Sequence, residues 1–388
     1  MSHRSAITFA FAVHGAVAGS LATRIPWVQD HLDLSPGVLG LALLCPSIGA
    51  FTGMPMASRL AHRLGQRRAI RLLLAMWCIV LALPALAPAP VWLFGAMVLY
   101  GASAGMCDVV MNAHAVALER RLKRSIMSSL HGMWCVGSLA GGGIGMLAAQ
   151  AGLDARVHLG LMALALLVLG DRMARGLLEV RADSVAPKRF ALPSRAIAAI
   201  GVVGFCATFA EGASANWAAV YLTEVTDAGP GVAAASYTLF MFSMAFARLV
   251  GDRFVQRLGP ARVIRWGGAL AVAGGVLVVT ARTPVLGIAG FAVLGLGLAV
   301  VVPLVFLAAG NAGRTPAEGV AGVATITYLS GLTAPAVTGW AAGAVSYPAA
   351  FAMITGVVVV MTLLAGVMRQ RPLPDAVVVS EERAPASA

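Results

Sequence analysis

The sequence predicts an all-α membrane protein with twelve spanning helices in two similar six-helix halves. Composition is the first observation: 59% of the 388 residues are hydrophobic and 11% are charged, whereas a soluble domain has roughly 45–50% and about 25%. An internal repeat is the second. Residues 252–265 match residues 58–71 at seven of fourteen positions, and the offset of 194 is half of the chain length. A repeat at that offset indicates two halves built alike.

The same offset holds without gaps elsewhere, for example where Pro36-Gly37-Val38 matches Pro230-Gly231-Val232. The proline at residue 90 matches that at 284, and Trp134 falls on Tyr328. Single matches in a chain rich in glycine and alanine are weak, and chance composition is the alternative explanation. Their common offset favours a duplicated half.

Six apolar segments of spanning length succeed one another in the first half, since a helix needs about 20 mostly apolar residues to cross the hydrocarbon layer. Polar residues 29–35 separate the first two, the basic residues 58–71 form the next loop, and prolines in 84–90 mark a turn. Two prolines interrupt the second span, which membrane helices tolerate. Glycines in 137–145 favour close packing within the bundle over dimerisation. We expect these spans at about residues 6–28, 37–57, 72–87, 91–118, 126–149 and 157–169.

The second half repeats this plan and has a charged segment on either side. Residues 1–170 are predicted to form the N-terminal bundle, 171–195 a cytoplasmic linker, 196–368 the C-terminal bundle and 369–388 a disordered cytoplasmic tail. The six later spans are expected at about residues 196–222, 232–250, 263–281, 285–309, 320–344 and 348–368.

Positive charge is distributed unevenly between the two sides of these spans. Of 28 Lys and Arg residues, 25 fall on the side of both termini, and only Arg24, Arg156 and Arg282 fall on the other. Such a bias places the richer side in the cytoplasm. We therefore expect a multi-pass protein of the inner (plasma) membrane with both termini cytoplasmic. The net charge of +12 then reports topology and does not indicate a nucleic-acid partner.

The sequence carries no signature of a cofactor, a metal centre or an enzyme. Its five cysteines lie in apolar stretches and form no Cys-x-x-Cys pair. The phosphate loop GxxxxGK and the HExxH pair are both missing from it. We expect no cofactor, no metal and no catalysis, which argues against an ATP-driven pump or a membrane hydrolase. A monomer in the lipid bilayer is expected.

Two carboxylates are predicted to lie isolated and deep within spans. Among sixteen Asp and Glu residues, only Asp108 and Glu211 fall there. A charge at the membrane centre costs about 2.5–3.5 kcal/mol on insertion scales, so such residues are functional candidates. Both can titrate and couple transport to protons, although sodium is also compatible with a deep carboxylate. The alternative for Asp108 is a hydrogen bond to neighbouring backbone.

Other polar and aromatic side chains within the spans are candidate contacts for a polar solute. Asn112 lies four residues from Asp108, so the two share a helix face. Each candidate has a structural alternative: hydrogen bonding for the histidines, a position at the outer interface for the arginine, and packing for the tryptophans. The predicted solute-binding residues are His14, Arg24, Asn112, His131, Trp134, Asn216 and Trp217.

Twelve spans in two halves, with a basic glycine-containing loop after spans 2 and 8, resemble the major facilitator superfamily. Its loop signature is Gly, three residues, Asp, a basic residue, one residue, Gly and further basic residues. Ser58 and His62 replace the Gly and the Asp in the first copy, and Asp252 and Gln256 replace them in the second. The resemblance implies that these loops act as conformational gates, with gate residues Arg63, Gly65, Arg67, Arg68, Asp252, Arg257, Gly259 and Arg262.

Four shorter segments are similar to a fucose-permease-like branch of uncharacterised bacterial inner-membrane transporters in that family. They are Asp108-Val-Val-Met-Asn112, Ser128-Ser-Leu-His131-Gly132, Glu211-Gly-Ala-Ser-Ala-Asn-Trp217 and Gly295-Leu-Gly297 with Pro303. The chain departs from that branch at Asn216, where Asp is frequent, and at Val300, where Asn is frequent. The resemblance implies alternating access around a central site lined by spans 1, 4, 7 and 10, near the bilayer midplane.

These observations predict a secondary active transporter that moves a small polar solute, such as a sugar, by proton symport. An exporter of amphipathic compounds on the same fold is the alternative, and a wide apolar cavity would favour it. A non-transporting membrane receptor is a further alternative from a different class. An intramembrane enzyme is the least supported, because the sequence shows no nucleophile–base pair.

Overall fold

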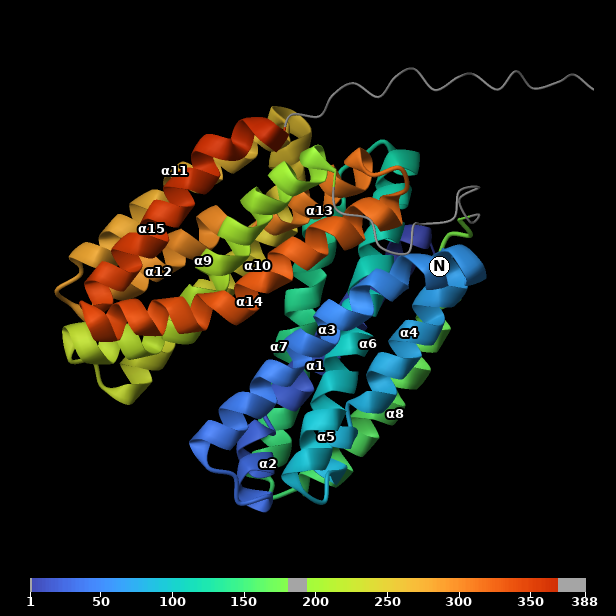
Figure 1. Ribbon diagram of the computed structural model, residues 1–388, viewed down its shortest axis with the longest axis horizontal. Helices are drawn as coiled ribbons and strands as arrows, with labels where there is room; N and C mark the ends of the chain where they lie inside the picture. Colours follow the sequence, from blue (N-terminus) through green and yellow to red (C-terminus); the bar gives the residue numbers. More distant parts are fainter. Residues whose placement is uncertain (1, 181–193, 369–388) are drawn as a thin grey trace, which may run out of the picture.

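The computed structural model describes residues 2–180 and 194–368, and its regular elements there are helices (Figure 1). The fold is the predicted all-α polytopic membrane fold with two pseudo-symmetric six-helix bundles. Eleven segments of the described chain are long and apolar enough to cross a membrane. The helix α10 (Pro230–Leu258) is a twelfth of spanning length, and its last third carries charged residues. About half of the predicted linker and all of the predicted tail lie outside the described residues.

The first bundle, called the N-half, contains α1 to α8, and the second, the C-half, contains α9 to η1. The N-half helices are α1 (His3–Ala22), α2 (Ile25–His31), α3 (Pro36–Leu64), α4 (Gln66–Val80), α5 (Leu83–Leu86), α6 (Pro90–Leu122), α7 (Met127–Gln150) and α8 (Ala155–Ala174). The C-half helices are α9 (Arg195–Thr226), α10, α11 (Pro260–Thr280), α12 (Pro284–Leu298), α13 (Val301–Ala312), α14 (Pro316–Ala344), α15 (Tyr347–Leu363) and η1 (Leu364–Met368).

The repeat is visible in how the helices begin and end. A proline opens both α3 and α10, and both α6 and α12, where its missing N–H and fixed φ suit the first helical turn. Gly65 and Gly259 end α3 and α10 with nearly equal backbone angles, φ 77° and ψ 150° against φ 79° and ψ 157°. Only glycine adopts these angles readily.

The prediction of a long loop over 58–71 is wrong. Helix α3 continues to Leu64 and α4 begins at Gln66, so Gly65 is the only residue between them, and Gly259 has this place in the second copy. The basic residues therefore extend the spanning helices beyond their apolar parts. The expectation that the second span tolerates its two prolines is confirmed, because α3 runs continuously through Pro46 and Pro55.

Glycines bring α1 and α7 into backbone contact, as the glycine-rich segment predicts. A Cβ atom on Gly15 would lie 2.0 Å from the carbonyl oxygen of Trp134, and one on Gly137 would lie 1.9 Å from that of Ala12. Real Cβ atoms do not approach so closely, so only glycine permits this packing. Close backbone approach through small residues is how membrane helices associate without a hydrophobic driving force.

One helix breaks the symmetry between the halves. α6 is continuous, whereas its counterpart is divided into α12 and α13 at Ala299 and Val300. Pro303 explains the break, because it has no N–H to donate to the carbonyl of Ala299. That carbonyl lies inside the membrane and needs another donor.

The halves meet through α7 against α10 and through α14 against α3 and α6. We call the end of the molecule where α1 begins and α15 finishes the terminal end. Figure 1 shows the bundles converging there and separating toward the opposite end, where α2 and α5 lie.

Candidate functional site

Asp108 lies near the middle of α6 and accepts hydrogen bonds from both halves. The Nδ2 of Asn112 donates to Oδ1 of Asp108 at 2.9 Å, one turn along the same helix. The hydroxyl of Tyr328, on α14, donates to Oδ2 at 3.2 Å. The sequence therefore predicted the pair on α6, but it did not single out Tyr328. The only available signal was the repeat, which aligns Tyr328 with Trp134.

His131 extends this chain of hydrogen bonds to α7. Its Nε2 lies 3.0 Å from Oδ1 of Asn112, so the imidazole donates there. The ring also lies beside Phe11 of α1 and Phe306 of α13, with centroid distances of 5.4 and 5.9 Å. One series of hydrogen-bonded side chains thus crosses from the N-half to the C-half, in the order His131, Asn112, Asp108 and Tyr328.

His14 and Trp134 form a second polar contact within the N-half. The indole Nε1 of Trp134 donates to Nδ1 of His14 at 2.9 Å, so the histidine carries its proton on Nε2 and donates to the carbonyl of Ala104 at 3.3 Å. Trp77 stacks on the same imidazole, with a centroid distance of 5.0 Å. Both ring nitrogens of His14 are therefore engaged with α6 and α7.

Glu211 lies at mid-length of α9, and the expectation that it is isolated is wrong. The Nη2 of Arg248, on α10, donates to its two carboxylate oxygens at 3.1 and 2.9 Å. The Arg248 side chain is 5% exposed and that of Glu211 is 24% exposed, so this is a largely buried ion pair. Arg248 was missed because it lies within a basic segment that the charge count assigned to the cytoplasmic side.

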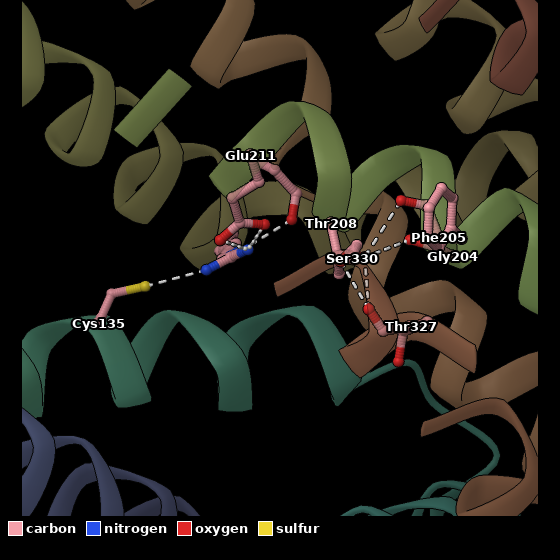
Figure 2. Close-up of polar contacts among 9 residues, drawn as sticks. Cys135, Gly204, Phe205, Thr208, Glu211, Thr327 and Ser330 are labelled. Carbon is pink, nitrogen blue, oxygen red and sulfur yellow. Dashed lines mark hydrogen bonds and ion pairs between the residues drawn. The ribbon is translucent and has the colours of Figure 1, made fainter. Parts of the chain in front are cut away.

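Arg248 also holds two other elements. Its Nε donates to the carbonyl of Ala299 at 2.9 Å, the group that Pro303 leaves without a helical donor. Its Nη1 donates to Sγ of Cys135, on α7 of the other half, at 3.2 Å. Figure 2 shows Cys135 on a helix that faces the one carrying Glu211, and both residues contact Arg248.

A hydroxyl cluster fixes α9 against α14 next to this ion pair. The hydroxyls of Thr208 and Ser330 lie 2.6 Å apart, and Thr208 also donates to the carbonyl of Thr327 at 3.1 Å (Figure 2). Thr208 precedes Glu211 by three residues, and Thr327 precedes Tyr328 directly. The cluster therefore holds the helices that carry Glu211 and Tyr328 in one fixed relation.

Three predicted solute-binding residues lie apart from Asp108. Arg24 lies between α1 and α2 and is buried toward the end opposite the terminal end, where it donates to Nδ1 of His158, on α8, at 3.2 Å. Asn216 is exposed and donates to Gly212 of its own helix at 2.8 Å. Trp217 packs near Tyr347 within the C-half, with a centroid distance of 6.2 Å.

Asp252, a predicted gate residue, contacts the other half at the terminal end. Its two carboxylate oxygens each accept one backbone N–H at 3.0 Å, from Ser128 and Ser129 in the first turn of α7. Glu119 accepts the preceding two, from Ile126 and Met127, at 2.8 and 3.1 Å. The free amides of this helix start are thus paired with one carboxylate from each half, which also suits the helix dipole.

Three further hydrogen bonds join the halves at the terminal end, among them one from Nη2 of Arg120 to the carbonyl of Gly310 at 3.1 Å. The Nε of Arg120, on α6, donates to Oδ1 of Asn311, on α13, at 2.6 Å. The Nε2 of Gln256 donates to the carbonyl of Ser125 at 3.3 Å. The other predicted gate arginines lie at this end as well: Arg67 is half-buried, and Arg63, Arg68, Arg257 and Arg262 are exposed.

Two repeated helical bundles that meet around buried polar groups define a polytopic membrane protein with the architecture of secondary transporters. A family model described as the Major Facilitator Superfamily matches residues 7–313 and 200–388. The chain belongs to the Major Facilitator Superfamily, which confirms the resemblance seen in the sequence.

Its curated relatives include transporters of similar length. The chain is 32% identical over 367 residues to an uncharacterised MFS-type transporter of Yersinia pestis, covering 91% of this chain and 92% of the relative. It is 31% identical over 366 residues to an uncharacterised transporter of Sinorhizobium fredii, covering 93% and 96%. These relatives support membership of the family along nearly the whole chain.

Solved structures share the fold at low sequence identity. FucP, an MFS transporter solved in the outward conformation, superposes with a TM-score of 0.78 at 14% identity, covering 95% of this chain and 99% of that chain. A second FucP structure is described as the Escherichia coli fucose:proton symporter. The human organic anion transporter MFSD10 superposes with a TM-score of 0.76 at 16% identity, covering 94% and 98%. At these identities the likeness shows the fold alone.

Proposed function

We propose that the chain is a secondary active transporter that moves a small polar solute by alternating access of its two halves. The observation that carries the proposal is the hydrogen bond from Tyr328 to Asp108, which joins the halves at mid-depth. Rocking of two repeated bundles changes the contacts between them around a central site. A solute bound at Asp108 is therefore placed to link its own binding to that motion.

Protons are the proposed coupling ion, with Asp108 and Glu211 as the titrating groups. The two side chains that donate to Asp108 are neutral, whereas Glu211 has a cationic partner in Arg248. A charged carboxylate without a cationic partner is costly at this depth, and at Asp108 binding a proton removes that cost. The description of FucP as a fucose:proton symporter supports proton coupling in this fold.

A sugar or another polyol is the proposed solute class. Hydroxyl groups can donate to the Asp108 carboxylate and accept from Asn112 and His131, so a polyol can replace the existing hydrogen bonds one for one. His14 and Trp134 are proposed to line the same region, with Trp134 offering a ring face to the solute. Arg24, Asn216 and Trp217 lie elsewhere and have no part in this proposal.

The terminal end is proposed to face the cytoplasm of the bacterial inner membrane. The excess of Lys and Arg on that side supports this orientation. With Asp252 on the first turn of α7, the halves are then joined at the cytoplasmic end. The protein is proposed to act as a monomer, since each chain contains both halves and the site between them.

Uptake of labelled sugars and small organic acids into cells expressing the chain tests the proposal, with and without an uncoupler. We expect uptake of one solute class that collapses with the proton gradient. Asp108→Asn should reduce gradient-driven uptake to background, because the amide has no ionisable group that could take up and release a proton during transport. Asp33→Asn is the matched control, because Asp33 is exposed and its left-handed conformation, φ 49°, suits asparagine.

Gradient-driven uptake that survives in both Asp108→Asn and Glu211→Gln would contradict proton coupling through these groups. A panel with no transported member calls for efflux from preloaded vesicles. Efflux of amphipathic compounds there would contradict uptake and favour export.

A further inference from the structure

Arg248 and Asp252 occupy one face of α10, because they are four residues apart. Both contact α7 of the other half: Arg248 through Cys135 and Asp252 through Ser128 and Ser129. Ser128 adds a third contact, since its hydroxyl donates to the carbonyl of Arg248 at 2.7 Å. One turn of α10 therefore connects the buried ion pair to the closed terminal end.

Glu211 is the only carboxylate that the structure places on Arg248 among the described residues. The other two acceptors are the carbonyl oxygen of Ala299 and the sulfur of Cys135. Breaking a buried ion pair by removing one charge is strongly destabilising, because the other charge remains uncompensated. The geometry around Arg248 therefore depends on the charge of Glu211.

The turn after Arg248 has no room to absorb a displacement locally. A Cβ atom on Gly251 would lie 2.5 Å from Cγ1 of Val300 and 2.6 Å from Oγ of Ser128. The backbone of α10 is thus packed between the break in α12–α13 and the start of α7. Movement of Arg248 must carry the neighbouring Asp252 with it, since the helix between them is rigid.

We propose that Arg248 is a positioning residue that couples the charge of Glu211 to closure of the terminal end. When Glu211 is neutral, Arg248 is left as an uncompensated cation, and α10 withdraws from α7 together with Asp252. The inference rests on the proposed function, in which Glu211 binds a proton during transport. Cys135 and His131 of α7 are the titratable groups that face Arg248 from the other half.

Cys135 offers a direct readout, because its thiol is buried against Arg248 and is 2% exposed. In a variant with alanine at the other four cysteines, residues 45, 78, 107 and 206, we would measure the rate of labelling by N-ethylmaleimide in membranes. Glu211→Gln should raise this rate by about tenfold or more, because it imitates the neutral carboxyl group. Glu224→Gln, on the exposed face of α9, is the matched control and should leave it unchanged.

A compensating variant separates uncompensated charge from lost packing. Glu211→Gln combined with Arg248→Met and Pro303→Ala removes both charges and gives the Ala299 carbonyl a helical N–H in place of Arg248, so labelling should return toward the parent rate. Pro303→Ala gives an independent test that keeps both charges. It supplies an N–H for the Ala299 carbonyl and weakens the hold on Arg248, so labelling should rise by a smaller factor.

Unchanged labelling in both Glu211→Gln and Pro303→Ala, in protein that elutes as a single species, would overturn the coupling role. Labelling that stays high in the triple variant would overturn it too, because packing alone would then be responsible. The proposed function is tested by a different outcome. If labelling of Cys135 rises in Glu211→Gln but uptake does not depend on the proton gradient, the coupling role of Arg248 is supported and proton-coupled transport is contradicted. Gradient-driven uptake with unchanged labelling contradicts the coupling role alone.

Discussion

At the level of single residues, the sequence identified the candidates whose position deep within a predicted span is itself unusual. Asp108 and Glu211 were found because a carboxylate is costly in that position. Their partners could not be found, since Tyr328 is 220 residues from Asp108 along the chain, and only the tertiary structure joins them. Arg248 was missed because the count of Lys and Arg on each side of the membrane assigned it to a cytoplasmic loop, whereas it lies inside the bundle.

The hydroxyl of Tyr328 is expected to matter for solute binding. Tyr328→Phe removes one donor from Asp108 and should raise KM by about threefold to tenfold, since a hydrogen bond contributes about 0.5–1.5 kcal/mol net. The initial rate of uptake against solute concentration measures this change. Tyr237→Phe serves as the control, because Tyr237 is exposed on α10. An unchanged KM for Tyr328→Phe would place the solute away from this hydroxyl.

At the level of elements, the sequence predicted which segments span the membrane but not how they join. Hydropathy reports where a helix is apolar, whereas α3 and α4 continue as helices through the basic residues beyond the apolar core. Their separation depends on one dihedral pair at Gly65, which no periodicity reveals. The repeat did indicate that Gly65 and Gly259 have the same place in their halves, and both have the glycine-specific backbone conformation.

Replacing Gly65 is therefore expected to destabilise the fold. Gly65→Ala should cost about 1–3 kcal/mol, the usual range for a residue forced into a sparsely populated region. Thermal unfolding of the detergent-purified protein measures this as a lower Tm. Gly40→Ala is the control, because Gly40 lies within α3 with open space where a Cβ would be added, so its Tm should stay equal or rise. A Tm of Gly65→Ala equal to the parent's would contradict the backbone argument.

For the whole molecule, composition and the repeat were sufficient to predict two six-helix bundles. They were insufficient to predict which end of the bundles is closed, because conformations of a transporter differ by only a few kcal/mol in total. The contacts that determine which end is closed involve few residues. Among them, Asp252 accepts from the first turn of α7, and Gln256 donates to the carbonyl of Ser125. No local sequence pattern specifies such pairings across halves.

Covalent closure of the terminal end should arrest transport. In a cysteine-free background, Ser125→Cys together with Gln256→Cys should be joined across the halves by a short thiol cross-linker that contains a reducible disulfide, since the Gln256 side chain already reaches Ser125. Uptake should then fall to background and recover on reduction. Each single cysteine variant is a control and should keep its activity with the cross-linker. Full uptake by the cross-linked protein would contradict opening of this end during the cycle.

The carbonyl of Ala299, which Pro303 leaves without a helical donor, has a consequence for the evolution of the sequence. Arg248 and Pro303 lie on different helices, yet each compensates for the other. Pro303 leaves the carbonyl of Ala299 without a helical donor, and Arg248, which needs a hydrogen-bond acceptor when buried, donates to that carbonyl. A lineage that loses the arginine gains from losing the proline as well, because the freed carbonyl would otherwise remain unpaired in the membrane. The two positions are therefore expected to change as a pair during the divergence of related chains.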